Sequence, residues 1–96
     1  MKKNEAKGKT GFGKIRIEYE VNGNVIRVYN SSSVCSLVIN GEIADQYFGI
    51  VGSNFCLKGQ IDAGEKTIPV EARMGQVNMR LYCDGLLVAK KFMAFG

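Results

Sequence analysis

Polar and apolar residues alternate along most of the chain from Ile15 onward. In KIRIEYEV (14–21), apolar side chains occupy the odd-numbered positions from Ile15 to Val21, and charged side chains occupy the positions between them. A period of two residues is typical of a β-strand that buries one face and exposes the other. Almost no segment has helical periodicity. The pattern therefore predicts an all-β protein.

Three Asx-Gly dipeptides separate apolar runs and predict hairpin turns. They are Asn22-Gly23, Asn40-Gly41 and Asp84-Gly85. Such dipeptides best tolerate the positive φ angles of a type I′ turn. A two-residue loop at the first of them would place Tyr19 opposite Ile26, which keeps the apolar faces of the two strands together.

The register of the second hairpin stays open. A two-residue loop at Asn40-Gly41 would place Glu42 opposite Ile39. A bulged three-residue loop would instead pair Ile39 with Ile43, so that two apolar residues face each other. The sequence pattern does not decide between these registers.

The remaining strands lie between the second and third of these turns. The runs SNFCLKGQI and KTIPVEARM flank the turn at 63–65, and Gly75-Gln76 reverses the chain once more. The sequence thus predicts seven to eight short antiparallel strands in a meander that forms a small sandwich or barrel. Pro69 cannot donate a ladder hydrogen bond, so its strand is predicted to lie at a sheet edge or to carry a bulge there.

The segments around the three turns indicate a degenerate internal repeat. Aligned on their Asx-Gly dipeptides, they are YEVNGNVIRV, LVINGEIAD and RLYCDGLLVA. The turns are eighteen and then forty-four residues apart. Intervals this unequal exclude a regular solenoid.

The excess positive charge lies at the N-terminus. Residues 1–14 contain five lysines and one glutamate, whereas residues 15–96 contain eight basic and eight acidic residues. This division predicts a flexible basic tail (1–14) and a single all-β domain (15–96). The tail's KGKTGFGK (7–14) has the composition of a phosphate-binding loop. Such a loop, however, follows a strand, precedes a helix and has a glycine where this chain has Lys3, so no nucleotide site is predicted in the tail.

Catalytic chemistry is sparse in this sequence. The chain contains no histidine, which excludes Ser-His and Cys-His nucleophile pairs, a histidine general base and histidine-containing metal sites. Glu18 and Glu20 share a strand face and could form an acid–base pair, but the solvated face of a one-sided sheet is the simpler interpretation. We expect a protein that is not an enzyme and uses no cofactor or metal.

The three cysteines point to a reduced protein. Cys35, Cys56 and Cys83 are odd in number, widely spaced and without a Cys-x-x-Cys pair, which favours neither a disulfide framework nor a metal site. Cys56 alternates onto the polar face of its strand beside Lys58. Exposure and a nearby cation favour the thiolate, so Cys56 is the candidate reactive thiol.

Two Arg–Tyr pairs are the candidate interaction residues. Arg27 alternates with Tyr29, and Arg80 with Tyr82, so each pair is predicted to share the outward face of its strand. Aromatic and basic residues interleaved on a sheet face can bind single-stranded nucleic acid. A tyrosine packed beside an arginine stem is also a common structural arrangement, and a neutral domain attracts phosphates weakly.

The order of turns also carries a family resemblance. VCSLVINGEIADQYFGIVGSNFCLKG followed by KTIPVEARMGQVNMRLYCDGLLVAKKF resembles the repeated β-hairpin units of the Fas apoptotic inhibitory molecule family. The resemblance covers roughly residues 15–95 and implies a compact antiparallel β-sandwich that acts through protein contacts. That family has a tryptophan in the strand after its Asp-Gly turn, where this chain has Tyr47-Phe48, and the resemblance carries no binding residue across.

The sequence therefore predicts a small non-enzymatic β-sandwich interaction module that binds protein partners or self-associates. A partner strand could add at an unpaired edge, near Pro69 or at either chain end. The alternative is binding of single-stranded nucleic acid or a nucleotide by a sheet face, aided by the basic tail. Neither a signal segment nor a bilayer-spanning apolar run occurs in the sequence, so we expect a cytoplasmic location and no membrane partner.

Overall fold

The protein is a sandwich of two antiparallel sheets. The structure, a computed structural model, describes residues 14–31, 34–48, 54–75 and 78–92, and this part of the chain contains eight strands and no helix. The strands are β1 (Lys14–Val21), β2 (Asn24–Asn30), β3 (Val34–Ile39), β4 (Glu42–Phe48), β5 (Phe55–Ala63), β6 (Lys66–Met74), β7 (Asn78–Cys83) and β8 (Leu86–Phe92).

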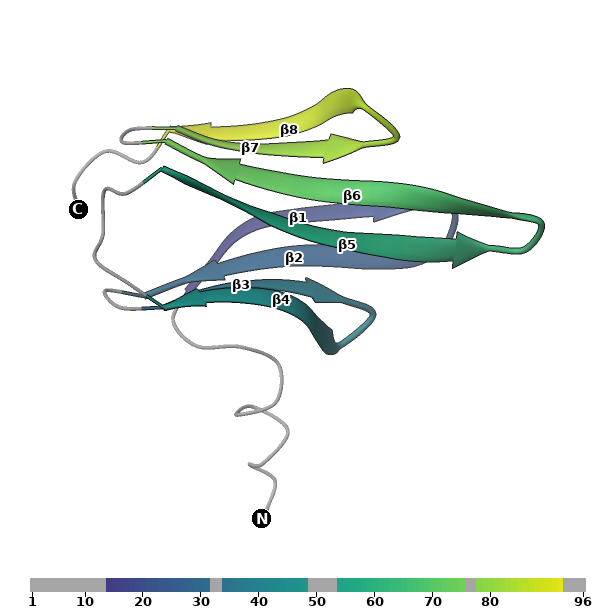
Figure 1. Ribbon diagram of the computed structural model, residues 1–96, viewed down its shortest axis with the longest axis horizontal. Coiled ribbons are helices and arrows are strands. Elements are labelled where there is room, and N and C mark those ends of the chain that lie inside the picture. Colours follow the sequence, from purple (N-terminus) through teal and green to yellow (C-terminus); the bar gives the residue numbers. More distant parts are fainter. Residues whose placement is uncertain (1–13, 32–33, 49–53, 76–77, 93–96) are drawn as a thin grey trace, which may run out of the picture.

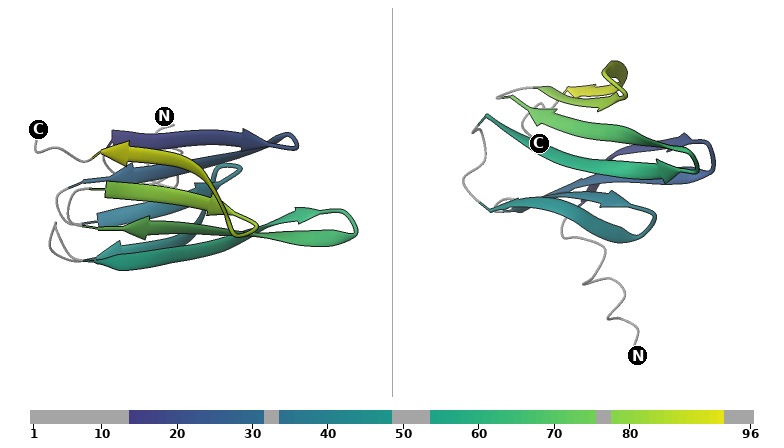
Figure 2. Two further views of the ribbon diagram at one scale, coloured as in Figure 1. Left: turned by 90° about the horizontal axis from the view of Figure 1, so that it is seen from above. Right: turned by 45° about the vertical axis from the view of Figure 1, so that its right-hand side comes forward.

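Each sheet contains four consecutive strands. The first sheet has the order β1-β2-β3-β4 and the second has the order β5-β6-β7-β8, and the two sheets face each other (Figure 1, Figure 2). The predicted all-β class is confirmed, with a sandwich rather than a barrel. Because β4 and β5 belong to different sheets, the structure holds two short meanders instead of one. Within the described residues no helix is long and apolar enough to cross a bilayer.

The hairpin turns have the backbone conformation that their Asx-Gly sequences predict. Positive φ angles occur at both loop residues of each Asx-Gly turn, for example 52° at Asn40 and 82° at Gly41, as a type I′ turn requires. Tyr19 lies opposite Ile26, as predicted. In the second hairpin, Ile39 lies opposite Glu42, so the two-residue loop is correct.

Three of the four edge strands contain a β-bulge. The unpaired residue is Arg16 in β1, Ala44 in β4 and Val88 in β8. Because of the bulge at Ala44, Tyr47 lies opposite Cys35, and both side chains face the core. Bulges at sheet edges also discourage pairing with another chain. Only β5 is a regular edge strand.

The two sheets repeat the same ladder at an offset of forty-four residues. Tyr29 lies opposite Ser36 in the first sheet, and Arg73 lies opposite Arg80 in the second. The bulged residues Ala44 and Val88 are separated by the same interval. Residues 25–48 and 69–92 therefore occupy equivalent positions, which gives each outward-facing residue a structural counterpart on the other sheet.

Side chains from both sheets form one apolar core. It includes Ile26 and Leu37 from the first sheet and Ile61, Met79 and Leu81 from the second, each at most 1% exposed. Full burial of one such side chain contributes about 1.5–3 kcal/mol to folding. At the edge of the sandwich, the ring of Tyr47 in β4 stacks on that of Phe55 in β5, with centroids 3.9 Å apart.

The predicted edge position of Pro69 is wrong. Pro69 is in β6, which lies between β5 and β7. The ladder between β6 and β7 ends at Val70 and Cys83, and beyond it the Pro69 carbonyl accepts a hydrogen bond from the Asp84 amide at 2.9 Å. Because Pro69 lies just beyond the end of the β6–β7 ladder, its missing N–H removes no hydrogen bond from that ladder. An internal strand therefore tolerates proline at this position.

The domain boundary differs from the sequence analysis by one residue. Lys14, which was assigned to the tail, is the first residue of β1 and lies opposite Asn30. The prediction of a flexible tail for residues 1–13 lies outside the described residues, as do Gln76 and Val77 at the predicted turn after Gly75.

Candidate functional site

The two Arg–Tyr pairs lie on opposite outer faces of the sandwich. Arg27 and Tyr29 belong to β2 in the first sheet, whereas Arg80 and Tyr82 belong to β7 in the second. All four lie on the outer side of their strands, because the residues alternating with them contribute to the core between the sheets. The pairs therefore cannot form one binding site.

In the first sheet, the Arg–Tyr pair is committed to contacts within the protein. Arg27 donates from Nε and Nη2 to one carboxylate oxygen of Glu18, at 3.1 and 3.0 Å. The hydrogen bond and charge of Glu18 raise the pKa of Arg27. Tyr29 is only 9% exposed, so the expectation that its ring is available on the surface is wrong. This pair is better suited to supporting the sheet than to stacking a base.

The pairing of Glu18 with Arg27 also bears on the candidate acid–base pair. Glu18 and Glu20 share the outer face of β1, as predicted, but Glu18 is held by the Arg27 guanidinium. Its role is explained by this exposed cross-strand ion pair.

In the second sheet, Tyr82 lies under a neighbouring guanidinium. The Arg73 guanidinium carbon is 4.8 Å from the centroid of the Tyr82 ring, a cation–π contact. Arg73 also donates to Glu71 in the same strand, with Nε 3.2 Å from the carboxylate. The hydrogen bond and charge of Glu71 raise the pKa of Arg73. Arg80 lies directly opposite Arg73 and is exposed.

Cys56 is exposed as predicted, but the expected ease of ionisation is wrong. Its thiol donates to Glu71 Oε2 at 2.7 Å. Partial burial, followed by the hydrogen bond and charge of Glu71, raises the pKa of Cys56 to about 11, and the opposing charges of Lys58 and Arg73 are weaker. The cation Lys58 is two residues away in the sequence, whereas the carboxylate of Glu71 comes from the neighbouring strand and no local pattern indicates it.

The other two cysteines are structural. Cys35 and Cys83 are free thiols buried in the core. Burial raises the pKa of Cys35 to about 12 and also raises that of Cys83. Within the described residues, no three histidine, cysteine or carboxylate side chains are placed to hold a metal ion.

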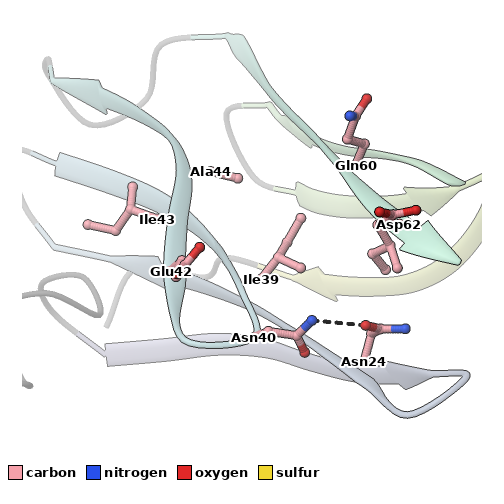
Figure 3. A pocket seen from close by; sticks show the side chains of 9 residues that line it. Asn24, Ile39, Asn40, Glu42, Ile43, Ala44, Gln60 and Asp62 are labelled. Atoms are coloured by element: carbon pink, nitrogen blue, oxygen red, sulfur yellow. Dashed lines mark hydrogen bonds between the residues drawn. The ribbon is translucent and has the colours of Figure 1, made fainter. Parts of the chain in front are cut away.

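An open hollow of about 270 Å³ lies between the β3–β4 hairpin and β5 (Figure 3). Glu42 on the first sheet and Asp62 on the second line it, above apolar side chains that include Ile39. Asn40 projects toward the hollow, yet its Nδ2 donates to Asn24 Oδ1 and its Oδ1 accepts from the Val25 amide, both at 2.9 Å. The side chain of Asn40 thus links the β3–β4 hairpin to the β1–β2 hairpin.

The outer face of the first sheet carries apolar side chains as well as the Glu18–Arg27 ion pair, which the polar–apolar alternation did not predict. Three cross-strand pairs share this face, namely Ile15 with Tyr29, Val34 with Phe48 and Val38 with Ile43. In each pair one member is buried and the other exposed. Exposure is 47% at Ile15, 70% at Phe48 and 37% at Ile43. We call these six residues the apolar outer face.

The sequence contained a signal for this face. In VCSLVI (34–39), apolar residues occupy both alternating sets of positions, and all six residues of β3 are buried. A continuous apolar run of this kind indicates a strand covered on both faces. Ser36, the polar exception, is fully buried and accepts a hydrogen bond from Gln46 Nε2 at 2.9 Å.

Comparisons with protein families, with curated proteins and with solved structures found no match for this chain. The resemblance to the Fas apoptotic inhibitory molecule family therefore stays a prediction.

Proposed function

We propose that this protein is a small non-enzymatic interaction module that binds a protein partner, in the simplest case a second copy of itself, through the apolar outer face. The observation that carries the proposal is the exposure of Phe48, Ile43 and Ile15 beside buried apolar neighbours on one sheet. Large exposed apolar side chains gathered on one face of a folded domain are typical of interaction sites, and Phe48 and Ile43 share edge strand β4. The partner would bury an apolar surface of its own against these side chains.

Two other observations support a binding role over a chemical one. The thiol of Cys56, the accessible cysteine, is held protonated by its surroundings, whereas nucleophilic catalysis uses the thiolate. The bulges on three edge strands oppose addition of a partner strand. Contact through a sheet face is thus favoured over the strand addition predicted from the sequence. Three free cysteines support the proposed cytoplasmic location.

The test uses two surface variants. Sedimentation velocity over a wide concentration range would be compared for the wild type, Phe48→Ser/Ile43→Ser and Leu86→Ser. Leu86 is 70% exposed, as Phe48 is, but lies in the second sheet, so it controls for the general effect of removing exposed apolar area. We expect association that the double variant abolishes and the control retains.

A partner other than a second copy requires a parallel measurement. Cross-linked complexes from cell lysate would be quantified by mass spectrometry for the same three proteins. A partner lost in Phe48→Ser/Ile43→Ser and kept in Leu86→Ser would support the proposal. A wild type that stays monomeric at every concentration and shares all its captured proteins with the double variant would overturn it.

A further inference from the structure

Three cations lie side by side across the outer face of the second sheet. Arg73 in β6 lies directly opposite Arg80 in β7, which lies directly opposite Lys90 in β8. All three side chains are exposed. Neighbouring strands are about 4.8 Å apart, so this cationic row spans about 10 Å. Arg73 is paired with Glu71, whereas Arg80 and Lys90 form no ion pair within the described residues.

The cationic row is not a requirement of the fold. Like charges placed directly opposite each other on a sheet are destabilising. The first sheet has the same ladder, and there the equivalent positions hold the uncharged residues Tyr29, Ser36 and Gln46. One half of this molecule thus forms the sheet without the cations, which points to a role for them outside folding.

An apolar pair lies next to the row along the same two strands. Tyr82 in β7 lies opposite Leu87 in β8, and the next outward-facing pair is Arg80 and Lys90. Leu87 is 51% exposed, and Tyr82 is partly exposed. The outer face of the β7–β8 hairpin therefore presents a cationic pair followed by an aromatic–aliphatic pair.

We infer that this face of the second sheet binds single-stranded nucleic acid. A nucleotide combines a phosphate with a flat base, which matches a cationic pair beside an aromatic–aliphatic pair. Arg80 and Lys90 would contact phosphates, and a base would pack on Leu87 and on the part of Tyr82 that the Arg73 guanidinium leaves exposed. The inference goes beyond the proposed function because it uses the opposite face of the sandwich.

An anionic membrane is a weaker match to this surface. Exposed Leu86 and Leu87 beside cations could approach a lipid surface. Asp84, however, is exposed in the turn beside Leu86, so an anionic lipid surface that buried Leu86 would meet this carboxylate. A strand of nucleic acid on Arg80 and Lys90 would lie further along β7 and β8. The flat arrangement of charges around an aromatic ring favours nucleic acid instead.

The experiment measures fluorescence anisotropy of a labelled oligothymidylate, roughly 15 nucleotides long, as a function of salt. In Arg80→Ser/Lys90→Gln, both cations are replaced by the residues that the first sheet carries at the same positions. The slope of log K against log salt should become less steep by about 1.4, since each lost phosphate contact on a single strand removes about 0.7. Tyr82→Leu should weaken binding by roughly five- to 150-fold, the loss given by one stacked base.

Matched controls separate this face from net charge. Lys14→Gln/Arg27→Gln removes two positive charges from the first sheet and should leave the slope unchanged. Arg80→Lys/Lys90→Arg keeps the charges and should keep the binding. The four lysines of residues 1–13 are present in every variant, so their attraction cancels. Circular dichroism would verify that each variant is folded.

Three outcomes would overturn the inference. They are no binding by the wild type, equal losses in Arg80→Ser/Lys90→Gln and in the Lys14→Gln/Arg27→Gln control, and tighter binding to phosphatidylserine vesicles or to polyglutamate than to the oligonucleotide. Phe48→Ser/Ile43→Ser should bind the oligonucleotide normally. The experiments can therefore contradict the proposed partner binding by the apolar outer face and the inferred nucleic-acid binding separately.

Discussion

The Asp45 carboxylate accepts a hydrogen bond from the backbone amide of Lys58 at 2.9 Å. The two residues belong to β4 and β5, which are edge strands of different sheets. The second carboxylate oxygen of Asp45 accepts from the Gln46 amide, also at 2.9 Å. β5 is the one edge strand without a bulge, and this contact occupies part of its free edge while it joins the two sheets.

We expect Asp45→Ala to lower the free energy of unfolding by about 1.5–3 kcal/mol, the usual value for hydrogen bonds to a charged group. Asp45→Asn should lose less because it keeps one acceptor. Urea denaturation measures both, with Asp62→Ala, which removes an exposed carboxylate of β5, as the control expected within about 0.5 kcal/mol of wild type. The Lys58 amide should also exchange its hydrogen faster in Asp45→Ala, and unchanged exchange would contradict the contact.

A second prediction concerns the close approach of the same two strands at Gly59. A Cβ atom there would lie 2.9 Å from the Ala44 Cβ and 3.0 Å from the Ile39 Cδ1. Ala44 has no rotamer by which to move away, so Gly59→Ala should destabilise the protein by about 1–3 kcal/mol. Gly75→Ala, whose Cβ would meet no atom closer than 3.6 Å, should have little effect. Equal denaturation midpoints for the two variants would argue against tight packing of β4 on β5.

The hairpins could be predicted from the sequence because their chemistry is local. A positive φ angle is set by the two residues of the turn, so Asn22-Gly23 was sufficient to place Tyr19 opposite Ile26. The separation into two sheets depends on contacts between strands that no local pattern encodes, such as that of Asp45 with Lys58. Pro69 shows the same limit, because whether a strand is internal depends on its neighbours.

The candidate sites were harder to predict than the fold. Alternation along a strand predicts an exposed polar face, but Tyr29 is buried on the outer side of the first sheet. Both Arg–Tyr pairs were candidate interaction residues, and the pattern along each strand did not show that the sandwich turns the outer faces of the two sheets away from each other. The cationic row arises only when Arg73 and Lys90 are brought beside Arg80 by pairing.

Cys56 should react slowly with alkylating reagents near neutral pH. Its pKa is raised from 9.0 to about 11, so iodoacetamide labelling, followed at the Cys56 peptide by mass spectrometry, should reach half its maximal rate near the higher value. Glu71→Gln should shift this midpoint downward, though only in part, because burial is the largest cause of the raised pKa. Glu18→Gln, on the other sheet, should not shift it.

The same raised pKa has a consequence for stability. A thiol whose pKa is higher in the folded state than in the unfolded state favours folding fully at low pH. This contribution should be lost as the pH rises from about 9 toward 11. Between about pH 9 and 11, the free energy of unfolding of Cys56→Ser should therefore fall less steeply than that of the wild type. Equal slopes for the two proteins would contradict this prediction.

The last prediction uses the repeat to test the two equivalent turns. In the first sheet, Asn40 Oδ1 accepts from the Val25 amide at 2.9 Å. The residue equivalent to Val25 in the second sheet is Pro69, which has no amide hydrogen to give Asp84. Both Asn40 and Asp84 have positive φ angles. Asn40→Ala should therefore cost about 2–3 kcal/mol, and Asp84→Ala only about 1–2 kcal/mol, the cost of the backbone conformation.

A double-mutant cycle isolates the missing hydrogen bond. Pro69→Val would supply a backbone N–H that can donate a hydrogen bond to the Asp84 carboxylate. The two residues are already adjacent, because the Pro69 carbonyl accepts a hydrogen bond from the Asp84 amide. Asp84→Ala should then cost about 0.5–1.5 kcal/mol more in the Pro69→Val background than in the wild type. Chemical denaturation of the four proteins gives this coupling. If Asp84→Ala costs the same in both backgrounds, the two turns do not differ by this bond.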